Sequence, residues 1–202
     1  MTPTGMTLRD HARGAVREEV LRQAWLLFAE QGFEATTVDQ VASAAGMSRR
    51  TFFRYFDGKD ELLLERLLES GERVAAALRE RPVQEPAWPA LRAAFEELVR
   101  PQEEHEEKTR RLQLMLRDEP GVRASVEERR RRWQELLAPL VAERLPGRRG
   151  GRGPDTRAGA VTASAIACLE VAQEAWAAQS GVRLGVLLDE SMRALAPLPA
   201  GA

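Results

Sequence analysis

The chain has little of what several classes of protein require. Its 202 residues include one cysteine, Cys168, so no disulfide can form within the chain, and no charged segment followed by an apolar one opens it. Both features favour a reducing, cytoplasmic location. No apolar run approaches the roughly 18 residues of a membrane span, and neither His11 nor His105 has a second histidine or cysteine at ligand spacing. We therefore expect neither membrane insertion nor a metal site.

Strand patterns are also nearly absent. Apolar residues recur at spacings of three and four along most of the chain, without alternating runs of β-branched and aromatic residues, which predicts an all-α protein. The net charge of −1 argues against a protein that coats nucleic acid through bulk positive charge. The net charge is nevertheless compatible with a local basic surface, because the segment from Ser48 to Lys59 holds four basic residues and one acidic residue.

Helical periodicity and helix-ending residues divide the chain into a small module, residues 13–58, and a larger helical region, residues 59–197. A long helix over about 58–81 joins the two parts, and residues 1–12 and 198–202 are expected to be tails. The expected helices cover about 13–31, 38–45, 48–56, 58–81, 88–99, 104–117, 121–145, 155–179 and 183–196, with Pro101 and Pro120 as helix ends and a flexible loop at 146–154.

Residues 37–56 have the pattern of a helix-turn-helix. Thr37 and Gln40 stand at the spacing of a capping box. Gly46 lies where a tight turn needs a positive backbone angle, and Ser48 can cap the following helix. In such a motif the second helix presents side chains to base edges in the major groove, and the first helix braces it.

The same segment resembles the N-terminal signature of the tetracycline-repressor (TetR) family over about residues 16–65. The matching residues stand in the family's order: Ala24, Phe28, Gly32, Phe33, Thr36, Thr37, Val38, Val41, Ala42, Ala45, Gly46, Ser48, Thr51, Phe52, Phe53, Tyr55, Phe56 and Lys59. The resemblance implies a homodimer with two DNA-reading heads and a C-terminal region that dimerises and binds a small effector. Phe53 departs from the pattern, because many members have a tyrosine there whose hydroxyl contacts phosphate.

DNA contacts are therefore expected from the reading helix and its neighbours. Arg49 and Arg50 can reach guanine edges or phosphates, and Lys59 can add a positive charge near the backbone. The complete set of expected DNA-binding residues is Thr37, Ser48, Arg49, Arg50, Thr51, Phe53, Arg54, Tyr55 and Lys59. Taken without their context, the arginines of this set would more often form a solvated helix face.

An effector cavity is expected among the helices from about 88 to 178. Three of the four tryptophans lie there, and aromatic walls suit an apolar guest, so the expected effector is a small, largely apolar molecule. The candidate lining residues are Trp88, Phe95, Leu112, Leu116, Trp133, Leu137 and Trp176, for each of which ordinary core packing is the alternative. The run Glu127 to Arg132 is interpreted as a solvated helix face, with an anion-binding rim as the alternative.

The last two helices are expected to form the dimer interface, because they combine small residues with a row of leucines: Ala160, Ala163, Ser164, Ala167, Ala172, Leu184, Leu187, Leu188 and Leu195. An ordinary helix pair within one protomer is the alternative.

The function expected is a dimeric repressor that an effector releases from a near-palindromic operator. A DNA-bound regulator controlled by a partner protein is the second reading. An enzyme is disfavoured, because no nucleophile and base set or phosphate-binding glycine loop is present, and no cofactor is expected.

Overall fold

The computed structural model describes residues 8–147 and 155–195, and within these ranges it is built of helices without strands. The helices are α1 (Leu8–Gln31), α2 (Val38–Ala44), α3 (Arg49–Phe52), α4 (Lys59–Glu80), α5 (Ala87–Ala94), α6 (Glu96–Glu104), α7 (Glu106–Asp118), η1 (Pro120–Val122), α8 (Arg123–Ala142), α9 (Thr156–Ala178) and α10 (Leu184–Ala194). The all-α prediction is confirmed.

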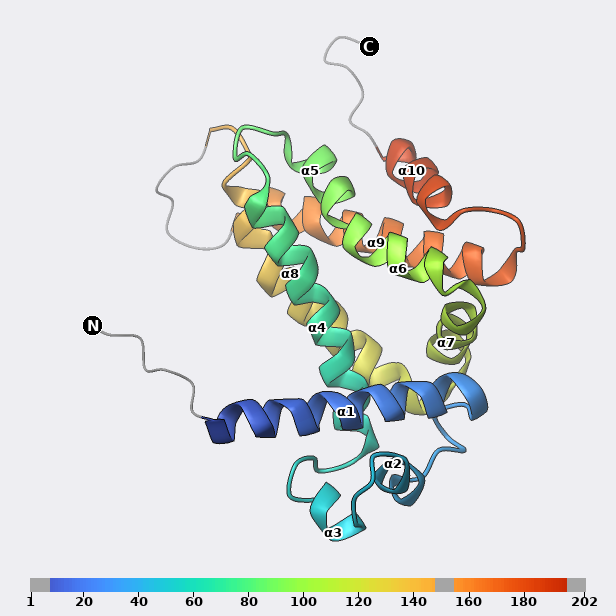
Figure 1. The fold of residues 1–202 in the computed structure, drawn as a ribbon. Helices are drawn as coiled ribbons and strands as arrows, with labels where there is room; N and C mark the ends of the chain where they lie inside the picture. Colours follow the sequence, from blue (N-terminus) through green and yellow to red (C-terminus); the bar gives the residue numbers. More distant parts are fainter. Residues whose placement is uncertain (1–7, 148–154, 196–202) are drawn as a thin grey trace.

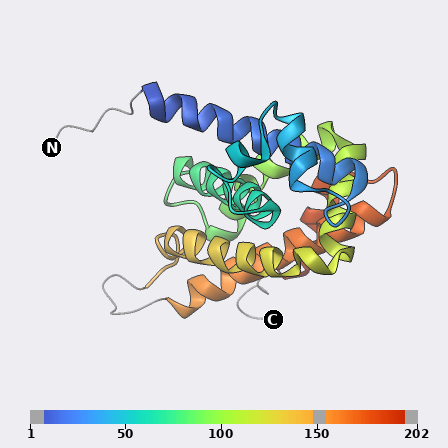
Figure 2. The ribbon, with the colours of Figure 1, turned by 90° about the horizontal axis from the view of Figure 1, so that it is seen from below.

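The helices form a small module at one end and a larger bundle above it. Figure 1 shows α2 and α3 below α1, with α4 rising from this module to the level of α5, α9 and α10 at the other end. Seen from below, α8 and α9 run side by side, next to α4 (Figure 2). The long helix α4 joins the two parts, as the sequence predicts.

Two hydrophobic cores hold these parts together. The upper core contains side chains of α5, α6, α8, α9 and α10 and of the second half of α4. The lower core contains the apolar faces of α1, α2 and α3 with the first half of α4. Helix α7 and the following turn also enter the lower core through Leu112, Met115 and Val122. The module that ends near residue 58 in the sequence is therefore completed by side chains some sixty positions further along the chain.

Several predicted boundaries are wrong. Helix α1 begins at Leu8, so part of the expected tail is helical. The helix expected over 48–56 has only one turn, because the amides of Arg54 and Tyr55 bond three residues back, to Thr51 and Phe52, and form turns. The helix expected over 88–99 is interrupted at Phe95. Pro101 lies inside α6, where it removes one amide from a helix that began five residues earlier and does not end it.

Three predicted features lie wholly or partly outside the described residues: the tail at 198–202, residues 1–7 of the tail predicted at 1–12, and most of the loop at 146–154. In the part of the chain that the structure describes, no helix combines the length and the hydropathy needed to cross a membrane.

Candidate nucleic-acid interface and ligand cavity

The helix-turn-helix is held by the local contacts that the sequence predicts. Thr37 accepts a hydrogen bond from the amide of Gln40, whose side chain accepts one in return from the amide of Thr37, at 3.2 and 2.8 Å. Gly46 has a φ of +68°, in the left-handed region that favours glycine. Ser48 caps α3 by accepting a bond of 3.1 Å from the amide of Thr51. These contacts fix the angle between α2 and α3.

The surface of α3 and of the turn that follows it presents three arginines and an aromatic ring to solvent. Arg49 pairs with Asp39 of α2 at 2.9 Å, and both side chains are about three-fifths exposed. Arg50 and Arg54 are exposed and form no ion pair with any residue in the described ranges. Phe53 is 45% exposed, which is high for a large apolar side chain. The exposed face therefore offers free guanidinium groups beside an apolar ring, a suitable surface for base edges and phosphates.

The opposite face of α3 is anchored to the helices behind it. Phe52 and Phe56 are buried in the lower core. Arg17 of α1 lies over the ring of Phe56 at 4.3 Å, donates to the carbonyl of Tyr55, and forms an ion pair with Glu65 of α4. Sequence reasoning missed Arg17, because its partners are 38 to 48 residues away along the chain.

Lys59 lies with its ammonium group turned into the protein. Its Nζ donates to the carbonyl of Phe33 at 2.8 Å and lies within 3.3 to 3.4 Å of the carbonyls of Thr36 and Glu34. It also lies over the ring of Phe33, 4.3 Å from its centre. Because these carbonyls engage the three donors of an ammonium group, the structure gives Lys59 the role of fixing the loop between α1 and α2.

The same loop is held from its other side by Glu119, which follows α7. The Glu119 carboxylate accepts hydrogen bonds from the amides of Phe33 and Glu34 at 3.1 and 2.8 Å. Two glycines permit the close approach: a Cβ at Gly32 would lie 2.5 Å from a Glu119 oxygen, and a Cβ at Gly121 would lie 2.0 Å from a Glu34 oxygen. The loop that leads into the reading head is therefore bonded directly to the end of α7.

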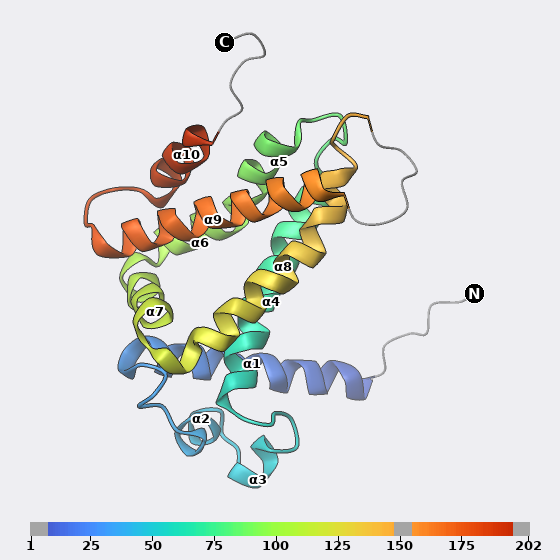
Figure 3. The ribbon, with the colours of Figure 1, turned by 180° about the vertical axis from the view of Figure 1, so that it is seen from behind.

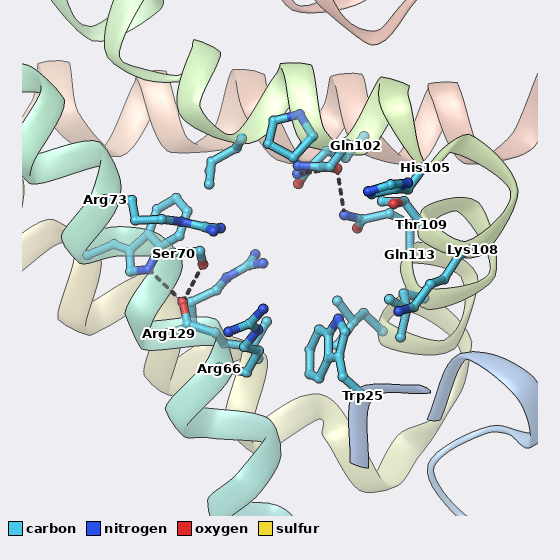
Figure 4. A pocket seen from close by; sticks show the side chains of 17 residues that line it. Trp25, Arg66, Ser70, Arg73, Gln102, His105, Lys108, Thr109, Gln113 and Arg129 are labelled. Atoms are coloured by element: carbon cyan, nitrogen blue, oxygen red, sulfur yellow. Dashed lines mark hydrogen bonds between the residues drawn. The ribbon is translucent and has the colours of Figure 1, made fainter. Parts of the chain in front are cut away.

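A half-open cavity of about 240 Å³ lies between α1, α4, α6, α7 and α8, and Gln173 of α9 also lines it. Figure 4 shows Arg66, Ser70, Arg73 and Arg129 along one side of it and Gln102, His105, Lys108, Thr109 and Gln113 along the other. Its apolar lining is Trp25, Leu67, Leu98, Pro101, Leu112, Leu116 and Trp133. Helix α7 thus connects this cavity with Glu119 and the loop before α2.

Charge in the cavity is positive. Burial, reinforced by the nearby charge of Arg66, lowers the pKa of Lys108 below its ordinary value. Burial also lowers the pKa of Arg129, which shares the carboxylate of Glu170 with Arg130 at 2.7 and 2.8 Å. The Arg129 side chain is only 10% exposed, so its prediction as part of a solvated helix face is wrong. Its partner is 41 residues away, which no helical spacing reveals.

Comparison with known proteins identifies both parts of the molecule. Residues 20–65 match the family described as bacterial regulatory proteins, tetR family, and residues 85–198 match the MftR C-terminal domain. The second match alone covers more than half of the chain. The chain belongs to the TetR family of transcriptional regulators.

Relatives of this TetR protein include named regulators. It is 40% identical over 94 residues to the transcriptional regulator TcmR of Streptomyces glaucescens, an alignment that covers 46% of this chain and 42% of TcmR. It is 31% identical over 134 residues to the transcriptional repressor AcnR of Corynebacterium diphtheriae, which covers 64% of this chain and 63% of AcnR. The chain thus aligns with less than two thirds of each of these relatives.

A solved TetR-family structure has the same fold. The repressor FadR of Thermus thermophilus, in complex with lauroyl-CoA, superposes with a TM-score of 0.57 at 25% identity, over 92% of this chain and 99% of that one. The N-terminal helix-turn-helix followed by a helical C-terminal region, predicted from the sequence, is therefore confirmed.

The predicted cavity residues divide into two groups in this TetR protein. Leu112, Leu116 and Trp133 line the cavity. The other four do not line it. Phe95, Leu137 and Trp176 are at most 1% exposed and belong to the upper core, and Trp88 packs against that core and donates its indole N–H to the carbonyl of Met192 at 3.2 Å. Residues that line the cavity and residues that only pack in the core both recur at helical spacing, so this spacing could not distinguish the two groups.

The polar wall of the cavity was missed altogether. Arg66, Arg73, Lys108 and Arg129 come from α4, α7 and α8, and each stands in a helical segment where charged residues usually face solvent. Arg66 and Arg73 are seven residues apart, two helical turns, which places them on one face of α4. That signal becomes informative only when the packing of the helices is known.

Proposed function

We propose that the protein is a dimeric repressor that reads a near-palindromic operator with α3 and leaves it when a small amphipathic molecule occupies the cavity. The observation that supports the DNA-reading role is the exposed face of α3 and of the turn after it, where Arg50 and Arg54 form no ion pair with any described residue. Free guanidinium groups on a helix of this motif suit base edges and phosphates.

Replacement of Arg50 by alanine tests this role. If its guanidinium reads a base, Arg50→Ala weakens operator binding by about 1–3 kcal/mol and leaves binding to random DNA nearly unchanged. Arg100→Ala is the matched control, because Arg100 lies on α6 and its side chain is 69% exposed. Binding is measured by fluorescence anisotropy at one fixed salt concentration. Equal weakening of both DNAs would withdraw the base-reading role.

A small-molecule effector is supported by the cavity and by its connection to the reading head. The cavity contacts α7, and the Glu119 carboxylate at the end of α7 holds the loop before α2. The complex of the FadR relative with lauroyl-CoA supports a ligand with an apolar portion. Because cationic and amide side chains line much of the cavity, we propose an amphipathic effector in place of the largely apolar one that the sequence favours.

Linkage gives the test of this effector role. A ligand that prefers the non-binding conformation a hundredfold shifts the equilibrium by about 2.7 kcal/mol, and operator DNA then weakens ligand binding by the same factor. Lauroyl-CoA and octanoate are the first candidates for calorimetric titration with and without operator. A compound that binds equally in both titrations is not the inducer.

Dimerisation is proposed through α9 and α10. Seen from behind, α9 lies in front of α6 (Figure 3). Its outward positions Ala160, Ala167 and Val171 are exposed, Val171 by 57%, and Val186 of α10 is 46% exposed. Small side chains in such a row let helices approach closely. Of the residues that the sequence assigned to this interface, Ala172, Leu184 and Leu188 are buried within the protomer, so they are corrected to core residues.

The dimer and its geometry have a direct test. With both heads on one face of DNA, half-sites should lie about 34 Å apart, one helical turn. Val171→Glu places a charge in the middle of the proposed interface, whereas Val83→Glu places one at a similarly exposed position outside α9 and α10. Sedimentation should show monomers for the first variant and dimers for the second. Dimers of both variants would place the interface elsewhere.

A further inference from the structure

We propose that the cavity binds the acidic group of a small organic anion inside the protein, between Arg73 and Arg129 on one side and Lys108 on the other. This inference rests on the proposed function, because it specifies the class of ligand for the same cavity. This binding mode differs from that of an acyl thioester whose charged nucleotide would lie outside the cavity. The carboxylate or sulfonate is instead the group that the cavity recognises.

The distribution of charge favours an anion. The residues that line the cavity include four cationic side chains and no aspartate or glutamate. Arg66 is paired with Glu69 at 2.8 Å, and Arg129 and Arg130 share one carboxylate. Arg73 and Lys108 form no ion pair with any residue in the described part of the chain. Arg73, which is exposed, and Lys108, which is half-buried, therefore offer cationic groups outside any described ion pair on both sides of the cavity.

Arg129 supplies a second, independent observation. Its side chain is nine-tenths buried, and one end of its guanidinium is fixed by the bond to Glu170 at 2.7 Å. Its Nε–H is buried and donates to no group among the described residues. A buried donor on a charged group is costly when unpaired, and it bonds strongly to an anionic acceptor. Figure 4 shows this side chain on the same side of the cavity as Arg66 and Arg73.

Size and polarity restrict the remainder of the ligand. The cavity of about 240 Å³ lies below the usual range for cavities that enclose drug-sized ligands, about 300–1,000 Å³. A coenzyme A nucleotide is much larger than this volume. Trp25, Leu112, Leu116 and Trp133 provide apolar contacts in the same cavity. An aromatic or medium-chain acid, with one anionic group and a compact apolar body, fits these dimensions.

A pair of fluorescent probes with the same aromatic skeleton tests the proposal in the full chain. 8-Anilinonaphthalene-1-sulfonate carries a sulfonate, and N-phenyl-1-naphthylamine lacks it. The sulfonate should bind at least about tenfold more tightly, which corresponds to about 1.4 kcal/mol. Equal affinities for the two probes would overturn it.

Substitutions at the cavity locate the binding. Arg73→Met and Lys108→Met should each weaken the sulfonate about tenfold and leave the neutral probe unchanged, because each variant removes one charge with little loss of side-chain length. Neither residue belongs to a described ion pair, so both variants should fold. Arg79→Met is the matched control: Arg79 is exposed on the same helix as Arg73 and does not line the cavity. If the control weakened the sulfonate as much as Arg73→Met, the proposed site would be wrong.

Octanoate and octanoyl-CoA separate a free acid from a thioester. Octanoate should displace the sulfonate probe from the wild-type protein and do so less effectively in the Arg73→Met variant. Displacement by octanoyl-CoA alone would place the charged portion outside the cavity and overturn the inference. If the anion binds as expected but operator affinity does not change, the anion site stands and the effector role in the proposed function fails.

Discussion

Glu119 bonds the two parts of the molecule at one point, and Glu119→Gln changes that point without changing the size of the side chain. In the native protein each carboxylate oxygen accepts one backbone amide, from Phe33 at 3.1 Å and from Glu34 at 2.8 Å. Glutamine retains one acceptor oxygen and places an NH₂ group against the other amide. The substitution therefore removes one bond, weakens the second by removing its charge, and sets two donors against each other.

The size of the effect follows from these contacts. Hydrogen bonds to charged groups contribute about 1.5–3 kcal/mol each, and neutral ones about 0.5–1.5 kcal/mol. Glu119 is only half-buried, and its bond to the amide of Glu34 is exposed to solvent. We therefore expect a loss of about 2 kcal/mol in unfolding free energy. For a chain of this length, that loss lowers Tm by about 4–8 °C.

Two measurements and one control test whether Glu119 holds the loop between α1 and α2. Thermal unfolding gives the loss of stability, and hydrogen exchange should show faster exchange of the Phe33 and Glu34 amides. Asp118→Asn is the control, because it removes a neighbouring exposed carboxylate that bonds to Arg117. The operator affinity of Glu119→Gln should also respond less to effector. Unchanged protection of the two amides, together with a Tm equal to that of the control, would refute the role of Glu119 in holding the loop.

Three further predictions concern other contacts. Lys59→Met should lower the free energy of unfolding by about 2–3 kcal/mol, because it removes the hydrogen bonds to the loop carbonyls. If chemical unfolding showed normal stability while the salt dependence of DNA binding fell, Lys59 would be a phosphate contact instead. Gly71→Ala should destabilise by about 1–3 kcal/mol, because its Cβ would lie 2.4 Å from Nε1 of Trp133. Gly14→Ala, with open space around it, should be neutral or stabilising by up to about 1 kcal/mol in the same thermal scan. Burial raises the pKa of the Cys168 thiol and so favours its uncharged, less reactive form. Iodoacetamide should therefore label the folded protein much more slowly than the protein in urea, and equal labelling rates would show that this thiol is accessible.

The sequence by itself determined the features that arise from neighbours along the chain. Thr37 and Gln40, three residues apart, form the capping box, and Gly46 adopts the positive φ that its place in the turn required. Phe52 and Phe56 are four residues apart and share the buried side of the module. A helix-turn-helix is specified almost entirely within twenty residues, and for this reason both its location and its family could be predicted.

Only the tertiary structure decided which side chains face the cavity and which hold the reading head. Arg129 meets Glu170 across 41 residues, and Glu119 meets Phe33 across 86. Trp133 and Trp176 both belong to the upper core, yet Trp133 also lines the cavity and Trp176 does not. Periodicity assigns a residue to one face of its helix, but the partner of that face depends on how the helices pack, which is a property of the whole chain.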